Sequence, residues 1–238
     1  MEDVLFLIPA RSGSKGVQDK NIKELFGIPL LAIRGLSALK LTAAEHIWLS
    51  TDSEHYAEIG RKYNITVPFI RPSNLADDTS TSADVVLHAM NFADQQGYAY
   101  KMVALLEPTS PFVYSAYLQE AIAELSANKD ASAIVATKEV EVASTFIQPQ
   151  SKYLDVLAEN LRKAKTMRRQ DFKNEITPAG GFYIAKWDHF LTHKTFYTDN
   201  TLSYLLPTEN ALEIDHMIQF HWAEYMVEKA IIDIKKII

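Results

Sequence analysis

Residues 3–23 read DVLFLIPARSGSKGVQDKNIK, and this stretch governs the interpretation of the whole chain. From Asp3 to Ile8 it is an apolar run of strand length. The segment that follows combines glycines, serines and several cations. Glycines let backbone N–H groups approach an anion, and cationic side chains neutralise it. We therefore predict a core strand that opens into a phosphate-binding loop, whose cations are Arg11, Lys15, Lys20 and Lys23.

The loop matches neither of the two common phosphate-binding motifs. It has no GxxxxGK[ST] sequence, and Gly13-x-x-Gly16 is not GxGxxG. A solvated basic loop after an edge strand is the other interpretation that these residues allow. The motif by itself leaves both interpretations open.

The composition is that of one globular α/β domain. The chain has 238 residues, 47% of them hydrophobic, which is ample for a core. It has no cysteine, so disulfides, thiolate metal sites and cysteine nucleophiles are excluded. The formal net charge of −6 argues against general nucleic-acid binding but not against a small anionic ligand. With neither a secretory signal nor a membrane-spanning stretch evident, we expect a soluble, cytoplasmic domain over residues 1–238.

Short β-rich runs alternate with helical patterns along the chain. This alternation is typical of a mainly parallel, doubly wound sheet with helices on both faces. The predicted strands cover residues 4–8, 46–49, 67–70, 102–106, 133–136, 181–185 and 202–206. The predicted helices cover residues 29–41, 53–63, 82–96, 115–127 and 215–237.

The pattern breaks between residues 139 and 178, which we interpret as an inserted arm or small subdomain. It contains a second basic segment, 162–173, whose simplest alternative role is a solvated helix face. The loops that follow predicted strands cover residues 9–23, 50–53, 71–82 and 107–112. Ligands of doubly wound sheets bind beyond the carboxyl ends of the strands, so these loops are expected to converge.

Several blocks of residues, in order along nearly the whole chain, point to one family. The first is PAR-x-GSKG followed by KN, at residues 9–21. The others are Arg71-Pro72 with Leu75-Ala76, Asp84-Val85 with His88-Ala89, Pro108-Thr109-Ser110-Pro111, Arg168-Arg169-Gln170-Asp171, Gly181-Phe182-Tyr183 and Glu213-Ile214-Asp215. Together they resemble the CMP-sialic acid synthetases, the acylneuraminate or nonulosonate cytidylyltransferases. The Kdo cytidylyltransferases are the nearer alternative, but their arginine-leucine-proline-glycine stretch is replaced by Lys15-Gly16-Val17-Gln18.

The resemblance implies a nucleotide-diphospho-sugar transferase (Rossmann-like) fold with a small dimerisation arm. It also implies nucleotidyl transfer, in which the anomeric hydroxyl of a nonulosonic acid such as sialic or legionaminic acid attacks the α-phosphate of CTP and pyrophosphate leaves. Such chemistry needs charge neutralisation, in-line placement and a metal, here Mg²⁺ or Mn²⁺. A homodimer is further implied, in which Arg168 or Arg169 reaches an active site, its own or the partner's.

The same resemblance marks individual residues. The catalytic candidates are Arg11, Lys15 and Asp215. The substrate-binding candidates are Ser12, Gly13, Ser14, Asn21, Arg71, Ser82, Glu107, Thr109, Ser110, Arg168, Arg169, Gln170 and Gly181. From the residues alone, Asn21 and Ser82 could equally be turn or helix caps, and Arg71 a surface loop residue.

Glu213 and Asp215 are the metal candidates. In an extended segment two residues apart, both carboxylates point to one side, which suits a Mg²⁺ ion that also binds phosphate oxygens. The alternative is that Asp215 caps the last helix and Glu213 is solvated. We assign neither His88 nor His216 as the general base, for which Asp215 or a metal-bound hydroxyl is the better candidate.

The chain departs from the family pattern at several positions. They are Ser12 for a frequent glycine, Glu107 for glutamine, Phe112-Val113 for leucine-arginine, Ala179-Gly180-Gly181 where an asparagine is usual, and Glu213 for aspartate. A carboxylate at position 107 would repel an acidic sugar unless it is paired with arginine or directed at an amide or hydroxyl. The sugar is therefore left open, and a non-catalytic nucleotide-sugar-binding homologue remains the alternative from a different class.

Overall fold

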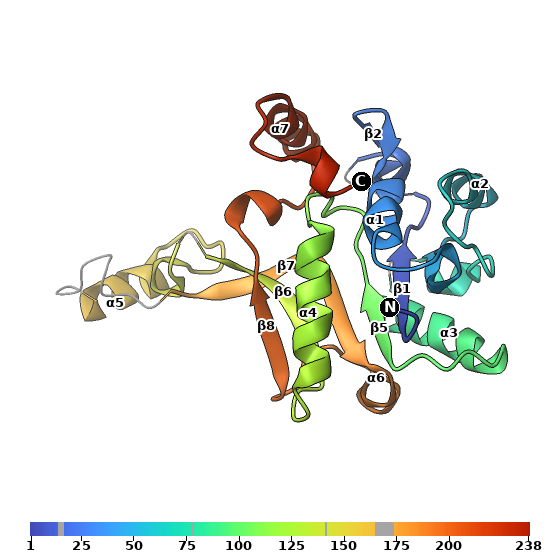
Figure 1. Cartoon of the computed structure of the whole chain (residues 1–238). Helices are drawn as coiled ribbons and strands as arrows, with labels where there is room; N and C mark the ends of the chain where they lie inside the picture. The colour runs from blue at the N-terminus through green and yellow to red at the C-terminus, as the bar shows by residue number, and fades with distance from the viewer. Residues whose placement is uncertain (14–16, 78, 141, 165–173) are drawn as a thin grey trace.

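The computed structural model describes residues 1–13, 17–77, 79–140, 142–164 and 174–238. Its centre is a six-stranded sheet in the order β4-β1-β5-β7-β6-β8 (Figure 1). These strands are β1 (Val4–Pro9), β4 (Ile47–Ser50), β5 (Met102–Leu105), β6 (Ala133–Glu139), β7 (Ile176–Lys186) and β8 (Thr201–Leu205). A separate hairpin pairs β2 (Glu24–Leu25) with β3 (Ile28–Pro29).

The sheet is mainly parallel, as the alternating pattern predicts. β1 pairs in parallel with both β4 and β5, and β6 pairs in parallel with β8. β7 runs antiparallel to both of its neighbours, β5 and β6. Because β4 and β5 lie on opposite sides of β1, the winding direction of the chain reverses at β1. The loops that leave the carboxyl ends of these strands border a crevice at that point.

Helices cover both faces of the sheet (Figure 1). One face carries α1 (Leu30–Leu39), α2 (Glu54–Lys62) and α4 (Ser115–Ala127), and the other carries α3 (Ser82–Gln95) and α6 (Trp187–His193). α7 (Met217–Glu228) packs in a third apolar cluster beside the hairpin, and α5 (Asp155–Lys163) belongs to the arm. None of the helices in the described ranges is long and apolar enough to cross a membrane.

β1 is apolar on both faces because helices cover it from both sides. Phe6 and Ile8 enter the cluster beneath α1 and α4, whereas Leu5 and Leu7 enter the cluster beneath α3 and α6. A strand buried on both faces appears in sequence as a continuous apolar run rather than an alternating one. This explains why the first strand is so evident in the sequence.

Local polar signals set the beginnings of two helices. The side chain of Ser53 accepts a hydrogen bond from the backbone N–H of Tyr56 at 3.4 Å, so Ser53 caps α2 as predicted. α3 is capped by Thr81, which forms a reciprocal capping box with Asp84. α3 begins at Ser82 as predicted, but the alternative role of Ser82 as the cap falls to the threonine one position earlier, which has the extended backbone that a cap needs.

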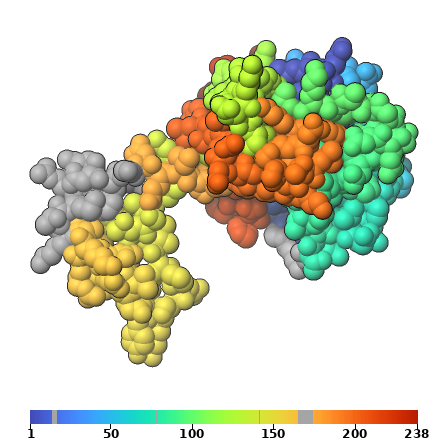
Figure 2. Space-filling model, turned by 90° about the horizontal axis from the view of Figure 1, so that it is seen from below, coloured from blue at the N-terminus to red at the C-terminus, as the bar shows by residue number. Residues whose placement is uncertain are grey.

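β6 and β7 continue past the sheet as a two-stranded ribbon that carries the arm away from the rest of the molecule (Figure 2). Val135 pairs with Tyr183, but Thr137 pairs with Pro178, so β7 bulges between these two pairs. Gly180, inside the bulge, has a φ of +62°, a conformation that glycine adopts without strain. The bulge lies against the side chains of Ser110 and Glu213 and so shapes the edge of the candidate site.

Two predicted elements differ from the structure. The strand predicted at 67–70 is absent: only Thr66 bridges to Trp48, and Pro68 has no N–H to continue the ladder. The last helix, predicted to reach residue 237, ends at Glu228. Ala230 adopts a left-handed φ of +55°, and the N–H of Ile231 bonds back to the carbonyl of Met226 at 2.9 Å. This is a helix stop without the usual glycine, so nothing in the sequence marks it.

Candidate active site

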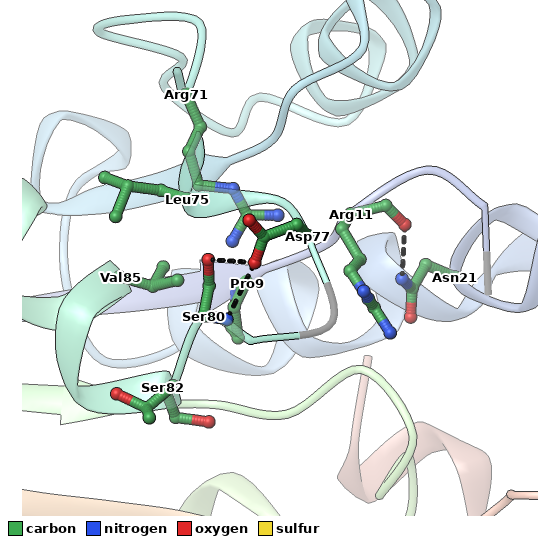
Figure 3. Close-up of a pocket in the computed structure, with 10 residues that line it drawn as sticks. Pro9, Arg11, Asn21, Arg71, Leu75, Asp77, Ser80, Ser82 and Val85 are labelled. Atoms are coloured by element: carbon green, nitrogen blue, oxygen red, sulfur yellow. Dashed lines mark hydrogen bonds between the residues drawn. The ribbon is translucent and has the colours of Figure 1, made fainter. Parts of the chain in front are cut away.

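The crevice at the carboxyl ends of the strands brings the predicted loops together. The segment after β1, the loop at 71–82 and the start of α3 enclose a cavity of about 230 Å³ (Figure 3). Its lining residues are Pro9, Arg11, Asn21, Arg71, Leu75, Asp77, Ser80, Thr81, Ser82 and Val85. Predicted site residues that are 60 or more positions apart along the chain, such as Arg11 and Arg71, therefore share one cavity.

Arg71 lines this cavity with only 4% of its surface exposed. Its backbone N–H donates to the carbonyl of Thr51 at 2.8 Å, and its Nη2 lies 3.9 Å from Oδ1 of Asp52. Burial lowers the pKa of Arg71 while Asp52 opposes that shift, and the guanidinium stays charged. Within the described residues, Nε and Nη2 of Arg71 make no hydrogen bond. A ligand that offers acceptor atoms would satisfy them.

A second wall of the cavity is built around the carboxylate of Asp77. Its Oδ1 accepts hydrogen bonds from the backbone N–H groups of Thr79 and Ser80, each at 2.9 Å. Hydrogen bonds from Thr79, and then from Ser80, lower the pKa of Asp77. The turn leads directly into Thr81 and α3, so Ser82 lines the cavity while Thr81 caps the helix.

The beginning of the predicted phosphate loop is anchored by Asp52. The backbone N–H of Ser12 donates to Oδ1 of Asp52 at 2.8 Å, and the Ser12 hydroxyl donates to Oδ2 at 2.7 Å. The serine that replaces the family's frequent glycine therefore adds a second bond to the loop. Gly13 follows with a φ of +73°, and Nδ2 of Asn21 donates to the carbonyl of Arg11 at 3.1 Å. The predicted residues Ser14 and Lys15 lie outside the described ranges.

Carboxylates gather at the other end of the crevice. Nζ of Lys20 lies 3.0 Å from Oδ1 of Asp215. Burial, together with the charges of Glu213 and Asp215, raises the pKa of Glu107 to about 7. Burial also raises the pKa of Glu213, against the effect of Lys138. Glu213 and Asp215 also line a second cavity of about 800 Å³, between the base of the arm and α7.

Arg34 lies beneath this acidic end. It is fully buried, and it donates from Nη1 to the carbonyl of Val113 at 3.2 Å and from Nη2 to the carbonyl of Gly181 at 2.9 Å. Burial lowers the pKa of Arg34 to about 10, while Glu107 opposes the shift. The arginine that offsets Glu107 is thus a buried residue already bonded to backbone. Gly181 is packed against Val113 and Leu206 and contributes its carbonyl to this bond.

Gly180, rather than Gly181, faces the acidic side chains. A β-carbon at position 180 would lie 2.7 Å from Oε1 of Glu213 and 2.9 Å from Oγ of Ser110, so no larger residue fits without movement. Oγ of Ser110 is buried and makes no hydrogen bond among the described residues. The carbonyl of Thr109 accepts a bond from the N–H of Ile214 at 2.8 Å, which ties the two predicted segments together.

Asp215 does not cap the last helix. His216 occupies the cap position, and Oε1 of Gln219 accepts from the N–H groups of Asp215 and His216 at 3.2 and 2.6 Å. The carboxylate of Asp215 is thus available to other partners, of which Lys20 is one. Among the described residues, no three His, Asp or Glu side chains converge as a complete metal site. A cation here would need further oxygen ligands from phosphate or water.

Comparison with known proteins connects this geometry to a family. The cytidylyltransferase family model matches residues 5–235, nearly the whole chain. The chain belongs to the cytidylyltransferase family. The match confirms the family resemblance that the ordered blocks indicate.

Two relatives of this cytidylyltransferase show how far the similarity extends. It is 32% identical, over 95% of its length, to an N-acylneuraminate cytidylyltransferase of Escherichia coli O18:K1:H7, of which it spans 52%. It is 29% identical to a pseudaminic acid cytidylyltransferase of Campylobacter jejuni, with 93% of this chain and 95% of the relative covered. The chain thus spans about half the length of the first relative and nearly all of the second.

A solved structure with the same fold is a CMP-2-keto-3-deoxy-manno-octonic acid synthetase complexed with CTP. It superposes with a TM-score of 0.68, covering 95% of this chain and 99% of that one, at 11% sequence identity. Such low identity supports the shared fold and no finer statement. It confirms the predicted fold class for this cytidylyltransferase.

Some residues of the site were not predicted from sequence. Asp52, Asp77 and Arg34 all make the contacts described above, and the signal that could have found the first two is their place in the predicted loops at 50–53 and 71–82. His88 contacts Phe69 edge to face at 4.5 Å, and burial followed by the charge of Arg71 lowers its pKa. These surroundings suit a neutral packing residue rather than a general base. The predicted residues Arg168, Arg169 and Gln170 lie outside the described ranges.

Proposed function

We propose that the protein catalyses, in the cytoplasm, the CTP-dependent activation of a nonulosonic acid, forming the CMP-sugar and pyrophosphate. The observation that carries the proposal is the buried Arg71, whose Nε and Nη2 find no hydrogen-bond partner in the described part of the chain and which lines a cavity that begins beside the anchored phosphate-loop residue Ser12. A nucleotide requires a hydrogen-bond donor for its base and a loop that binds its phosphates. Both lie at this crevice. The named activities of the relatives support the same reaction.

The nucleotide end of the site divides into two parts. Arg71 and Ser82 contact the cytosine or ribose, because a guanidinium donates to a carbonyl oxygen and a hydroxyl can both donate and accept. Arg11 and Lys15 neutralise the triphosphate, with backbone amides at Ser12, Gly13 and Ser14. Asn21 positions the main chain of Arg11 through the bond at 3.1 Å.

Asp215 and Glu213 are the residues that would hold Mg²⁺ or Mn²⁺. Magnesium is commonly bound by one or two carboxylates, with substrate phosphates and water completing the octahedron. Two carboxylates, one of which pairs with Lys20 of the predicted phosphate loop, fit that pattern. A bound cation would supply charge neutralisation at the reacting phosphate. Asp215 is also the candidate for accepting the proton of the sugar hydroxyl.

The acceptor end is built from Glu107, Thr109 and Ser110, with Gly181 beneath and the basic residues Arg168 and Arg169 and the amide of Gln170 supplied by the arm. Glu107 and the unpaired Ser110 hydroxyl favour hydroxyl or amide groups of the sugar. The sugar carboxylate then has to be bound by the arm's cations, because Glu107 would repel it. Sialic, legionaminic and pseudaminic acids all carry these groups, so the acceptor is proposed at the level of the class, with N-acylneuraminate as one member.

The arm supports a homodimer. It exposes several large apolar side chains, namely Val142, Phe146, Ile147, Tyr153, Leu154, Val156 and Leu161. Apolar surface of this extent on a thin projection favours burial against a partner. A second copy related by a two-fold axis is the commonest arrangement. We therefore propose residues 139–178 as the dimerisation arm.

A pyrophosphate-release panel tests the function. The purified full-length chain is assayed with CTP, UTP, ATP and GTP against sialic, legionaminic and pseudaminic acids and the eight-carbon sugar Kdo. We expect release only with CTP and a nine-carbon acid. Preference for the eight-carbon sugar would establish the Kdo alternative, and CTP binding without release in any combination would establish a non-catalytic homologue.

A further inference from the structure

We propose that Asp52 is a positioning residue that couples the nucleobase end of the site to its phosphate end. It does so by contacting Ser12 and Arg71 at the same time. The identity of the two ends rests on the proposed function. The coupling itself rests on the contacts of one carboxylate, which belongs neither to the cavity lining nor to the acidic end.

On the phosphate side, Asp52 uses both of its oxygens on a single residue. Ser12 donates its N–H to one oxygen at 2.8 Å and its hydroxyl to the other at 2.7 Å. A two-point contact to a carboxylate fixes orientation as well as distance. The direction in which the chain leaves Ser12 toward Gly13 is therefore set by where Asp52 stands.

On the base side, the same carboxylate faces Arg71. Nη2 of Arg71 is 3.9 Å from Oδ1 of Asp52, the oxygen that also accepts from the Ser12 N–H. The charge of Asp52 supports the charged form of Arg71, whereas Arg11 opposes it. Because Arg71 is almost completely buried, it depends on this anion to hold its place. A displacement of the Asp52 carboxylate therefore changes the positions of both Ser12 and Arg71.

The support beneath Asp52 is rigid. It follows Ser50 and Thr51, which are fully buried, and it precedes Ser53, which caps α2. The same helix reaches the far end of the predicted loop, since the hydroxyl of Tyr56 donates to Oδ1 of Asp19 at 2.9 Å. The β4–α2 segment therefore holds residues on both sides of the loop, and Asp52 is the part of it that also reaches Arg71.

Two ligands that each favour the same position of a shared group bind with positive coupling. The probes are cytidine, which carries only the base and ribose, and pyrophosphate, which carries only phosphate. Cytidine is uncharged, so no direct charge attraction links the two. We expect saturating pyrophosphate to lower the Kd of cytidine about fivefold in the wild-type protein, the lower end of typical coupling between sites.

The experiment measures this ratio by calorimetric titration of the full chain and of variants. Asp52→Asn keeps an acceptor for Ser12 but removes the charge that holds Arg71, and its ratio is expected to fall below about twofold. Ser12→Ala keeps the N–H bond and loses only the hydroxyl bond, and its ratio is also expected to fall. Glu54→Gln is the matched control: it neutralises an exposed carboxylate that pairs with Arg61 in α2, and its ratio should equal that of the wild type.

Three results would overturn the coupling. They are a wild-type cytidine Kd that pyrophosphate does not change, an Asp52→Asn ratio equal to that of the wild type, and an unchanged ratio in Ser12→Ala. If near-ultraviolet circular dichroism shows that Asp52→Asn does not fold, the ratio measured for Ser12→Ala decides whether the coupling exists. If both probes bind but do not affect each other, only the role of Asp52 is refuted. If neither probe binds, the nucleotide site and the coupling are both refuted.

Discussion

At the residue scale, the site combines cations with carboxylates whose burial differs. Arg71 is nearly inaccessible and stays charged beside Asp52. Glu107 lies near the carboxylates of Glu213 and Asp215 and near a buried Arg34 whose Nη1 and Nη2 already bind backbone carbonyls. Desolvation and like charges favour the protonated carboxyl at Glu107. The nucleotide end of the site is therefore permanently cationic, while the acceptor end changes its charge near neutral pH.

Glu107 makes the stability of the protein depend on pH. Folding raises the pKa of this carboxyl from 4.5 to about 7. Below pH 4.5 it is protonated in both the folded and the unfolded state, so it favours neither. As the pH rises toward 7 it ionises in the unfolded state first, which lowers the free energy of unfolding. Glutamine does not ionise, so the Glu107→Gln variant does not show this fall in the free energy of unfolding. Its free energy of unfolding relative to the wild type should therefore increase by on the order of 3 kcal/mol between pH 5 and pH 8. Urea titrations at several pH values, with EDTA present, measure the difference. Parallel curves for the two proteins would contradict the assignment.

Asp215 links the metal to turnover. We predict that Asp215→Ala abolishes pyrophosphate release while CTP still binds weakly, because the cavity that Arg11 and Arg71 line does not include Asp215. Wild-type activity should vanish in excess EDTA and return with Mg²⁺ or Mn²⁺. Activity and calorimetric CTP binding are measured on the same preparations. Full turnover in EDTA would refute the metal sites at Asp215 and Glu213.

At the scale of elements, helix starts and a strand bulge place the functional groups. α2 begins after its cap Ser53, which immediately follows Asp52, and α3 begins after its cap Thr81, so the caps of both helices lie next to residues that contact the site. β7 bulges around Gly180, where the missing side chain leaves room for Glu213 and Ser110. The two caps and the bulge are each formed by residues that are neighbours in the sequence. Each nevertheless helps to position residues that belong to another element.

At the start of α3, the Thr81 hydroxyl caps the helix, and the Ser82 hydroxyl is proposed to contact the nucleotide. Thr81→Ala removes the half of the capping box in which the Thr81 hydroxyl accepts from the N–H of Asp84, and should lower the free energy of unfolding by about 1 kcal/mol. Ser82→Ala leaves the cap intact and should change stability by less than about 0.5 kcal/mol, while it weakens CTP binding. Chemical denaturation and nucleotide titration of the two variants, run side by side, make the comparison. Equal destabilisation by both would show that the helix begins elsewhere.

At the scale of the whole molecule, the net charge of −6 says little about the ligand. Arg11 and Arg71 line the cavity where the nucleotide is proposed to bind, together with Asp77, whereas Glu213 and Asp215 line the second cavity. The arm projects from the rest of the molecule (Figure 2). Several of its large apolar side chains are exposed. Its basic residues then have a use if the arm meets a second subunit.

Mixing two inactive variants tests that arrangement. Lys15→Ala and Arg168→Ala should each be inactive alone. If Arg168 acts in the partner's site, subunit exchange should restore up to about a quarter of the wild-type specific activity, because half of a random mixture is heterodimer and one of its two sites is intact. Sedimentation at micromolar concentration establishes the dimer independently. Proven exchange without recovery would place Arg168 in its own chain's site.

The sequence alone was sufficient for whatever depends on neighbouring residues. The order of strands and helices, the Ser53 cap and the family blocks all follow from short-range patterns of apolar, polar and turn residues. Contacts between distant positions could not be predicted this way. Asp52 reaches Ser12 over 40 positions, and Arg34 reaches Gly181 over 147. The end of α7 at Glu228 also escaped prediction, because a non-glycine residue adopts the left-handed turn there. Only the tertiary structure decided these features, since the free energy that holds them comes from burial and charge pairing between elements rather than from local propensity.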